Sequence, residues 1–415
     1  MRILIATYFA LPHIGGIWTY VSHLKQYLER LGHKVDILAR HPKDRIYYML
    51  HQDTFFKKED GKNWVSSLHS DRYHQIQLAS DPFIKNMELE RYIYEAAVTH
   101  FGVANYDLIH TQDIISTRAI AKVKPKQTPL ILTIHGYFTE ELLIRGIIKS
   151  KNSDQWKYSS SLEYHGLTSS DFTIFPSLWM KNIFVQEINV PDRHLEVIPN
   201  GLDIENFIKN MKKKIRMSLP SDKKVIVCVA RLEKLKGHKY LLDALAKLKQ
   251  ERTDWICWIV GQGYLQKELE QQCKKLQLDR DVLFLGVRND VPALLKRADV
   301  CVLPSLQENC PYFVMESQIA GKPIIASAVG GIPEMIQDGC TGLLSQPGQS
   351  ESLYLNLRKI LKEDTLRAQI ANNTENWGRT HWSLDTMVKR TLTVYERALR
   401  KKYLSKKAYK KLNPF

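Results

Sequence analysis

The sequence predicts an α/β fold built from two Rossmann-like domains, because one pattern of apolar and amphipathic segments occurs twice. Arg2–Thr7 is apolar like a buried strand, and a glycine-containing loop, an amphipathic run at Val21–Leu31 and a second strand at His33–Ala39 follow it. The alternation starts again at Lys224–Ala230. Alternating strands and helices form parallel sheets covered by helices. Since 415 residues are too many for one ordinary core, the two patterns indicate two domains.

The first predicted domain covers residues 1–200. Beyond its opening strand–helix–strand unit, strand-like runs return at Tyr106–His110, Pro129–His135 and Phe172–Pro176. The stretch from His41 to Tyr106 is polar, aromatic and irregular, so the sequence predicts no regular element there.

The second predicted domain covers residues 201–384, and the boundary lies near Pro199–Asp203. From His381 the chain is expected to be helical through Arg400, and residues 401–415 form a strongly basic tail. Strands and helices alternate along this domain, which is typical of a second doubly wound sheet. Its segments are strand Lys224–Ala230, helix Lys239–Gln250, strand Trp255–Val260, helix Leu265–Leu276, strand Val282–Leu285, a helix near Ala293 and strand Val300–Leu303.

Charge and composition narrow the partners of this chain. The formal net charge is +16, so an anionic partner is expected. The sequence has no zinc finger, aromatic RNA-binding motif or basic zipper, which argues against nucleic acid and favours nucleotide diphosphates or an anionic membrane surface. It has no CxxC pair that would indicate zinc or a disulfide framework. It also lacks a signal-like start and an apolar run of about 20 residues, so a cytoplasmic protein is expected, with peripheral contact at the inner face of the membrane left open.

Two glutamates form the most informative motif. Glu308 and Glu316 lie between two strand-like runs, and Pro311 and Gly321 suit the start and the end of a helix. Glu308 is then expected in the loop at the helix N-terminus, where open parallel sheets bind ligands. A carboxylate can accept hydrogen bonds from two neighbouring hydroxyls, so the pair predicts a polyhydroxylated ligand. Taken alone, the same spacing also fits a helix cap followed by a solvated helical residue.

The surrounding motifs resemble those of family 4 of the retaining GT-B glycosyltransferases, which use nucleotide sugars. The resemblance implies the GT-B fold, in which two Rossmann-like domains face each other across a cleft. It implies acceptor binding by the first domain, donor binding by the second, and a helix at about 385–400 that packs back on the first. The run Asn309-Cys310-Pro311 departs from the glycines of many members and marks a subgroup. The motifs are Val229–Gly237, Val260–Gly263, Phe284–Gly286, Ala298–Ser305 and Val329–Glu334.

The resemblance also assigns roles in donor binding. Arg231 and Lys236 would stabilise the departing diphosphate without a metal. Taken alone, the same run of charged residues is typical of a solvated charge cluster. The other donor-binding assignments are Gly16 for the diphosphate, Glu308 for the sugar hydroxyls, Glu316 for the ribose, Gly286 and Val287 for the base, and Asn309, Cys310 and Pro311 as further contacts.

His135 ends a predicted strand, and the resemblance places it against the transferred sugar, although a structural histidine is the alternative. The expected catalytic residues are therefore Glu308, His135, Arg231 and Lys236. Asp279-Arg280-Asp281 mimics the DxD signature of metal-dependent sugar transferases, but it falls at the boundary of a helix and a strand, so no metal site is predicted. No cofactor is expected either.

Together these features predict a retaining glycosyltransferase with a nucleotide-sugar donor, most often a UDP-sugar in such proteins. The expected acceptor is a glycan or a lipid-linked molecule of cell-surface polysaccharide biosynthesis. Two alternatives are a nucleotide-sugar epimerase of the same fold and a non-catalytic sugar-binding or coat-associated protein. The family's motif set argues against the epimerase, and the presence of Arg231, Lys236, Glu308 and Glu316 argues against a degenerate site.

Overall fold

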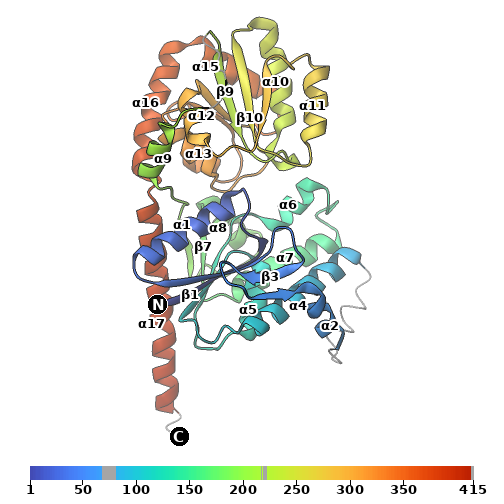
Figure 1. Ribbon diagram of the computed structural model, residues 1–415, viewed down its shortest axis with the longest axis vertical. Helices are drawn as coiled ribbons and strands as arrows, with labels where there is room; N and C mark the ends of the chain where they lie inside the picture. Colours follow the sequence, from blue (N-terminus) through green and yellow to red (C-terminus); the bar gives the residue numbers. More distant parts are fainter. Residues whose placement is uncertain (68–80, 216, 218–221, 413–415) are drawn as a thin grey trace. The chain divides into compact units, whose positions relative to one another are not determined.

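The computed structural model describes residues 1–67, 81–215, 217 and 222–412, without the side chains of 405–412. The chain divides into two compact units (Figure 1). Unit 1 contains Met1–Pro199 and Met387–Phe415, and unit 2 contains Asn200–Thr386. Among the described residues, no helix is both long enough and apolar enough to cross a membrane.

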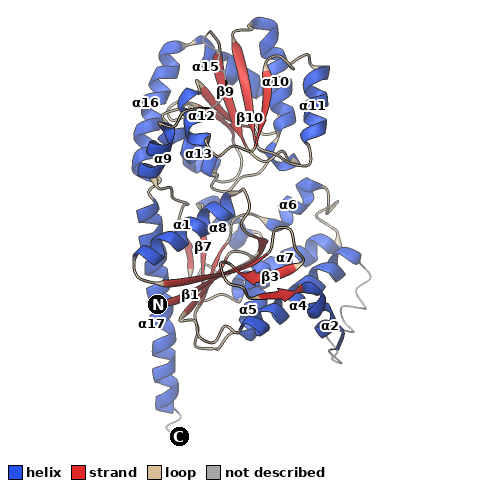
Figure 2. Cartoon of the chain, in the orientation of Figure 1, coloured by secondary structure: helices blue, strands red, loops and turns tan. Residues whose placement is uncertain are grey.

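Unit 1 is built on a sheet, whose strands are red in Figure 2. The sheet has eight strands in the order β4-β3-β2-β1-β5-β6-β7-β8. The pairs that involve β3 are antiparallel and the others are parallel. The strands are β1 Arg2–Ala10, β2 Lys34–Arg40, β3 Ile46–Met49, β4 Phe55–Lys57, β5 Leu108–Thr111, β6 Leu130–Thr133, β7 Phe172–Phe175 and β8 Leu195–Val197. The helices are α1 Gly16–Arg30, α2 Lys58–Ser67, α4 Pro82–Phe101, α5 Ile114–Val123, α6 Phe138–Arg145, α7 Asp154–Thr168, α8 Leu178–Gln186 and most of α17 Leu384–Leu412.

Helices cover both faces of this sheet, because each strand presents alternate residues to opposite faces. Ile109 of β5 packs into a core built with α4 and α5. The next residue, His110, contacts Tyr20 of α1 and Tyr395 of α17 instead. The carboxyl ends of the parallel strands then lead into the loops that carry polar residues.

The prediction of an irregular stretch between His41 and Tyr106 is wrong for the described part of it. This stretch forms β3, β4, α2 and the 20-residue helix α4, while residues 68–80 lie outside the described residues. Arg91 explains why the pattern was hidden. It is a buried charge on α4, paired with Glu88 at 2.7 Å and Glu95 at 3.2 Å, so a polar residue occupies the face that periodicity expects to be apolar.

Unit 2 is built on a six-stranded sheet in the order β11-β10-β9-β12-β13-β14, and every pair is parallel. The core on one face joins β9 and β10 with α10 and α15. Separately, α12 contacts β9 and α13 contacts β12. The strands are β9 Lys224–Val229, β10 Trp255–Val260, β11 Val282–Gly286, β12 Val300–Leu303, β13 Ile324–Ser327 and β14 Leu343–Ser345. The helices are α9 Ile204–Met211, α10 His238–Glu251, α11 Gln266–Lys275, α12 Val291–Arg297, α13 Tyr312–Ile319, α14 Ile332–Met335, α15 Ser350–Lys362 and α16 Asp364–His381.

The last helix differs from its prediction at both ends. It begins at Leu384, because the chain leaves the helical conformation at Trp382 and Ser383 after α16. It also continues through the predicted tail as far as Leu412. Within unit 1 the helix is fixed by Tyr395, whose hydroxyl lies 2.7 Å from Nδ1 of His110.

Candidate active site

Two loops at the carboxyl ends of β9 and β12 meet in unit 2. Gly237 makes this approach possible, because a Cβ atom at that position would lie 1.9 Å from the carbonyl oxygen of Pro304. The glycine also has a φ of 65°, which other residues rarely adopt. Leu306 N–H donates to the carbonyl of Leu235 at 2.7 Å. The backbone therefore brings Lys236 beside the loop that carries Glu308.

Lys236 and Glu308 form a partly buried ion pair. Nζ of Lys236 donates to Oε1 of Glu308 at 2.6 Å, and Oγ of Ser305 donates to the same oxygen at 2.8 Å. Glu308 is 9% exposed. Within the described part of the chain, the other carboxylate oxygen, Oε2, has no hydrogen bond. An ionised carboxylate accepts through both oxygens, so this atom can take a hydrogen bond from a ligand hydroxyl.

Arg231 has a different partner. Its guanidinium lies 2.8 Å from Glu233, and its side chain is 44% exposed. The structure thus places Arg231 on the same loop as Lys236 but does not join it to the Lys236–Glu308 pair. The exposed guanidinium still carries donors that a diphosphate could use.

The residues after Glu308 are held by their main chain. Asn309 and Cys310 are buried, and Pro311 occupies the N-cap position of α13. Nδ2 of Asn200 donates to the carbonyl of Cys310 at 2.9 Å. Burial raises the pKa of the Cys310 thiol to about 12, so this cysteine is protonated at neutral pH and is a poor nucleophile.

Glu316 is half-buried on α13, and its carboxylate has no hydrogen bond or ion pair with any residue that the structure describes. Burial raises the pKa of its carboxyl to about 7. A half-buried carboxylate without a protein partner is costly, and ligand hydroxyls could satisfy it.

Gly286 and Val287 lie at the end of β11. Gly286 has a φ of 62°, and its carbonyl accepts a hydrogen bond from Gly261 N–H at 2.8 Å. The Val287 side chain is 42% exposed. This strand end is therefore open to a ligand, and it is fixed to the neighbouring strand.

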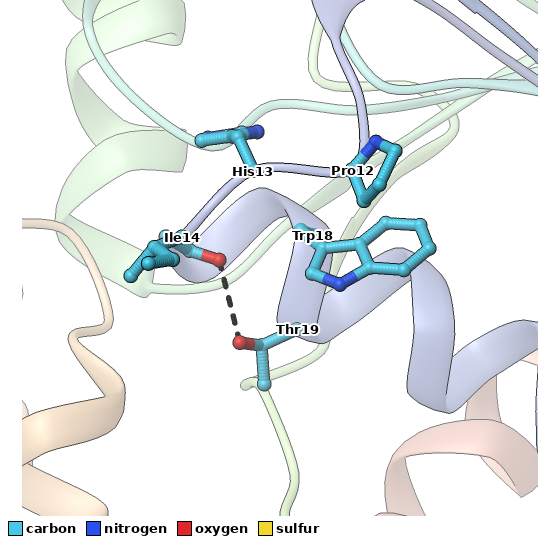
Figure 3. A pocket seen from close by; sticks show the side chains of 6 residues that line it. Pro12, His13, Ile14, Trp18 and Thr19 are labelled. Carbon is cyan, nitrogen blue, oxygen red and sulfur yellow. Dashed lines mark hydrogen bonds between the residues drawn. The ribbon is translucent and has the colours of Figure 1, made fainter. Parts of the chain in front are cut away.

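In unit 1, Gly16 begins α1, and the loop before it borders a shallow hollow of about 410 Å³ (Figure 3). Figure 3 shows Trp18 and Pro12 on one side of this hollow and Ile14 on the other. The hydroxyl of Thr19 donates to the carbonyl of Gly15 at 3.3 Å, which fixes the turn into the helix. The lining residues are Pro12, His13, Ile14, Gly15, Trp18 and Thr19.

His135 follows β6 and is held by neighbours. Its Nε2 lies 2.9 Å from Oε1 of Gln112, so Nε2 carries the proton, and its ring packs edge-on against Tyr20. Burial lowers the pKa of His135 to about 3. The imidazole is therefore neutral at physiological pH and can contact a sugar only as a neutral group.

The DxD-like run has a structural role. Asp281 is buried and pairs with Lys249 at 2.8 Å and with Lys223 at 3.3 Å. Its charge is already compensated by two lysines, which explains why a buried acidic residue lies just before β11.

The structure thus brings together Lys236 and Glu308, with Ser305, and it places Glu316 on the following helix. It leaves Arg231 on a separate ion pair, and Gly16 and His135 belong to unit 1. Sequence reasoning did not identify Ser305, which is the last residue of one quoted motif and whose contact becomes visible only in three dimensions.

Comparisons with known proteins fit this arrangement. Residues 210–377 match the model of the glycosyl transferases group 1, and residues 14–206 match that of glycosyltransferase family 4. The chain belongs to the group 1 glycosyltransferases.

Two similar proteins match 96% of the chain, and a third matches 64% of it. An uncharacterized glycosyltransferase of Methanocaldococcus jannaschii is 28% identical over 96% of this chain and 99% of its own length. The UDP-Gal:alpha-D-GlcNAc-diphosphoundecaprenol alpha-1,3-galactosyltransferase of Escherichia coli is 28% identical over 64% of this chain and 69% of its own. HepE of Anabaena in complex with UDP matches in structure with a TM-score of 0.66 and 20% identity, over 96% of this chain and all of that one. This glycosyltransferase therefore has the GT-B fold, as predicted.

Proposed function

We propose that this glycosyltransferase transfers a sugar from a UDP-sugar to a glycan or lipid-linked acceptor, with retention of anomeric configuration. The Lys236–Glu308 pair carries the proposal, because it places a cation and a carboxylate together at the carboxyl end of a parallel sheet. Oε2 of Glu308 would accept a hydroxyl of the donor sugar. Lys236 has further donors for the phosphate that gathers charge as the glycosidic bond breaks.

The remaining residues complete a donor site. Glu316 would accept the ribose hydroxyls, and main-chain groups at Gly286 and Val287 would hold the base. Arg231 would leave Glu233 and pair with the diphosphate, since a guanidinium can bind phosphate through two parallel hydrogen bonds. These charges lie on the protein itself, so the leaving diphosphate can be stabilised without a metal.

Retention and the choice of UDP rest on the relatives. The Escherichia coli relative uses UDP-Gal and makes an α-1,3 linkage, and HepE binds UDP. UDP-galactose carries an α-linked sugar, so an α-linked product keeps that configuration. We expect the leaving phosphate to accept the acceptor's proton on the same face, which requires no covalent nucleophile from the enzyme. Neutral His135 would contact the transferred sugar.

The acceptor in that relative is GlcNAc linked to diphosphoundecaprenol, which favours a role at a membrane surface in the synthesis of a cell-surface polysaccharide. Such a role would place the enzyme in the cytoplasm at the inner face of the membrane. An epimerase of the same fold would instead convert one nucleotide sugar into another. Its product would be an epimeric nucleotide sugar and not free UDP.

A panel of nucleotide sugars tests the proposal directly. Purified protein is incubated with UDP-glucose, UDP-galactose, UDP-N-acetylglucosamine or GDP-mannose, and binding is measured by calorimetry while released nucleotide is measured by chromatography. We expect one UDP-sugar to bind and to release UDP slowly by hydrolysis. Binding of none of the four, or appearance of an epimeric nucleotide sugar, would contradict the proposal.

A further inference from the structure

The helix that follows Glu308 is anchored at both ends by residues close to the boundaries of unit 2. At its N-terminal end, Nδ2 of Asn200 donates to the carbonyl of Cys310 at 2.9 Å. Near its C-terminal end, Nε1 of Trp382 donates to Oε1 of Gln318 at 2.5 Å. The unit begins at Asn200 and ends at Thr386, so the chain passes α13 both as it enters and as it leaves.

The entering and leaving segments are also bonded to each other. Leu202 N–H donates to the carbonyl of Trp382 at 2.8 Å, and Leu384 N–H donates to the carbonyl of Leu202 at 3.0 Å. A Cβ atom on Gly201 would lie 2.8 Å from Cα of Leu384, so this close pairing requires glycine. Asn200 therefore extends from a fixed piece of backbone and not from a free linker.

Asn200 is bonded to the loop that contacts the donor sugar in the proposed function. The main chain of Glu308 is held by Gly331, whose N–H lies 3.3 Å from the Glu308 carbonyl. Two residues later, Asn200 holds the carbonyl of Cys310. Asn200 is 7% exposed, and its Oδ1 has no hydrogen-bond partner among the described residues. A buried amide whose oxygen accepts no hydrogen bond lowers the stability of the folded protein. The presence of Asn200 at this position therefore needs an explanation.

We propose that Asn200 is a positioning residue for the donor sugar. It fixes the main chain at Cys310 and thereby directs the loop Glu308–Pro311 towards the sugar. This inference rests on the proposed function, in which that loop contacts the sugar and Glu316 contacts the ribose. Loss of the bond should weaken sugar recognition and leave nucleotide recognition largely unchanged.

Calorimetry with two probes separates these effects. The dissociation constants of UDP and of the UDP-sugar that the wild type binds are measured for the wild type, Asn200→Ala and Asn200→Asp. We expect the ratio of the UDP-sugar constant to the UDP constant to rise about tenfold in both variants, which corresponds to a loss of about 1.4 kcal/mol. The control is Asn210→Ala, which removes an amide that bonds only Asn206 on α9 of the same unit, at 3.4 Å, and should leave the ratio unchanged.

The possible outcomes are distinct. An unchanged ratio in folded Asn200 variants would overturn the positioning role, as would an equal loss for both probes, which indicates general damage. Asn200→Asp keeps the side-chain volume, so it serves if Asn200→Ala does not fold. If neither folds, amide exchange of wild-type Asn309 and Cys310 decides: the UDP-sugar must protect them more than UDP does. Failure of the wild type to bind any nucleotide sugar would refute the proposed function instead.

Discussion

At the scale of single residues, Glu316 links burial to ligand binding. Partial burial raises the pKa of its carboxyl to about 7, and within the described residues no protein group pairs with it. In the proposed function Glu316 accepts ribose hydroxyls through both carboxylate oxygens, and protonation turns one of these oxygens into a donor. Under that proposal, binding of a donor would compete with a proton in the neutral pH range.

We predict that UDP-sugar affinity falls on acidification. With a pKa of about 7, the ionised fraction drops roughly tenfold between pH 8 and pH 6, and the apparent dissociation constant rises by about the same factor. Calorimetry at pH 6, 7 and 8 measures this. The buried histidines do not interfere, since burial lowers the pKa values of His110 and His135 to about 3 and that of His238 to about 4.

The matched variant is Glu316→Gln, which keeps the shape and cannot ionise. It should bind the UDP-sugar more weakly than the wild type at pH 8, with little change between pH 6 and 8. A pH slope that persists in Glu316→Gln would show that another group is responsible.

The second residue-scale prediction concerns Lys236. In the proposed site, its removal takes away a charge near the leaving phosphate, and it leaves the buried Glu308 carboxylate without its cation. We expect Lys236→Ala to lower turnover by a factor of about 10² to 10³. The control is Lys247→Ala, because Lys247 forms an exposed ion pair with Glu351 on the surface of the same unit and should be neutral.

Released UDP gives the turnover, and circular dichroism with thermal unfolding confirms that both lysine variants fold. Near-normal turnover in folded Lys236→Ala would remove this lysine from the site.

At the scale of elements, the start of α6 depends on a buried acid. Oε1 of Glu163 on α7 accepts a hydrogen bond from Phe138 N–H at 2.8 Å, and Oε2 accepts one from the hydroxyl of Thr139 at 2.5 Å. Burial nevertheless raises the pKa of Glu163 to about 8. The element that follows His135 is thus held by a side chain that is protonated near neutral pH.

This shift predicts a pH dependence of stability. Between pH 4.5 and pH 8 the folded protein keeps a proton on Glu163 that the unfolded chain has released, so the contribution of Glu163 to stability falls as pH rises. Glutamine cannot ionise. Its Oε1 can still accept from Phe138 N–H, and its Nε2 can donate to the hydroxyl of Thr139, which reverses the direction of that bond. Glu163→Gln should therefore gain stability relative to the wild type as pH rises from 5 to 8, by up to about 1.4 kcal/mol for each unit.

Urea unfolding at several pH values measures this gain, and Glu268→Gln on the exposed face of α11 is the control. A difference between Glu163→Gln and the wild type that does not vary with pH would show that Glu163 is ionised in the folded protein.

Sequence reasoning was most accurate for elements buried on both faces. The bounds predicted for Trp255–Val260 are those of β10, where all six residues are buried, so no solvent-facing side chain interrupts the apolar run. It failed for α4, whose start is nevertheless marked by Asp81 as N-cap and Pro82 as the first residue. Phe83 N–H donates to Oδ1 of Asp81 at 2.8 Å. This Asp-Pro pair is a local sequence signal for a helix start, and an argument from periodicity alone does not use it.

The candidate site shows the same division. The sequence placed Glu308 in a loop and Glu316 on a helix, because Pro311 and Gly321 mark that helix locally. The partner of Arg231 could not be predicted, since Glu233 and a ligand phosphate are both suitable anions. The bond between Asn200 and Cys310 joins residues 110 positions apart and follows from packing.

At the scale of the whole molecule, the net charge of +16 requires an explanation. Part of the basic C-terminal segment is used within unit 1, because Lys402 pairs with Asp171 at 2.8 Å. The side chains of Lys406, Lys407, Lys410 and Lys411 lie outside the described residues. We propose that these four lysines hold the enzyme at an anionic membrane surface near a lipid-linked acceptor.

Truncation after Leu404 tests the tether, since it removes the four lysines and keeps the contact of Lys402. Each lysine near an anionic surface contributes about 1 kcal/mol. We therefore expect the full chain to sediment with vesicles of anionic phospholipid at low salt, and the truncated chain to sediment far less. High salt should release the full chain, because screening shortens the range of the attraction.

Net charge alone could produce the same result, and a charge-matched variant separates the two causes. Replacing Lys209, Lys212, Lys213 and Lys214 of unit 2 with glutamine removes four positive charges elsewhere on the surface. If the tail is the tether, this variant binds vesicles like the full chain. Equal loss of binding in the truncated and the charge-matched proteins would show that the overall charge, and not the tail, attracts the membrane.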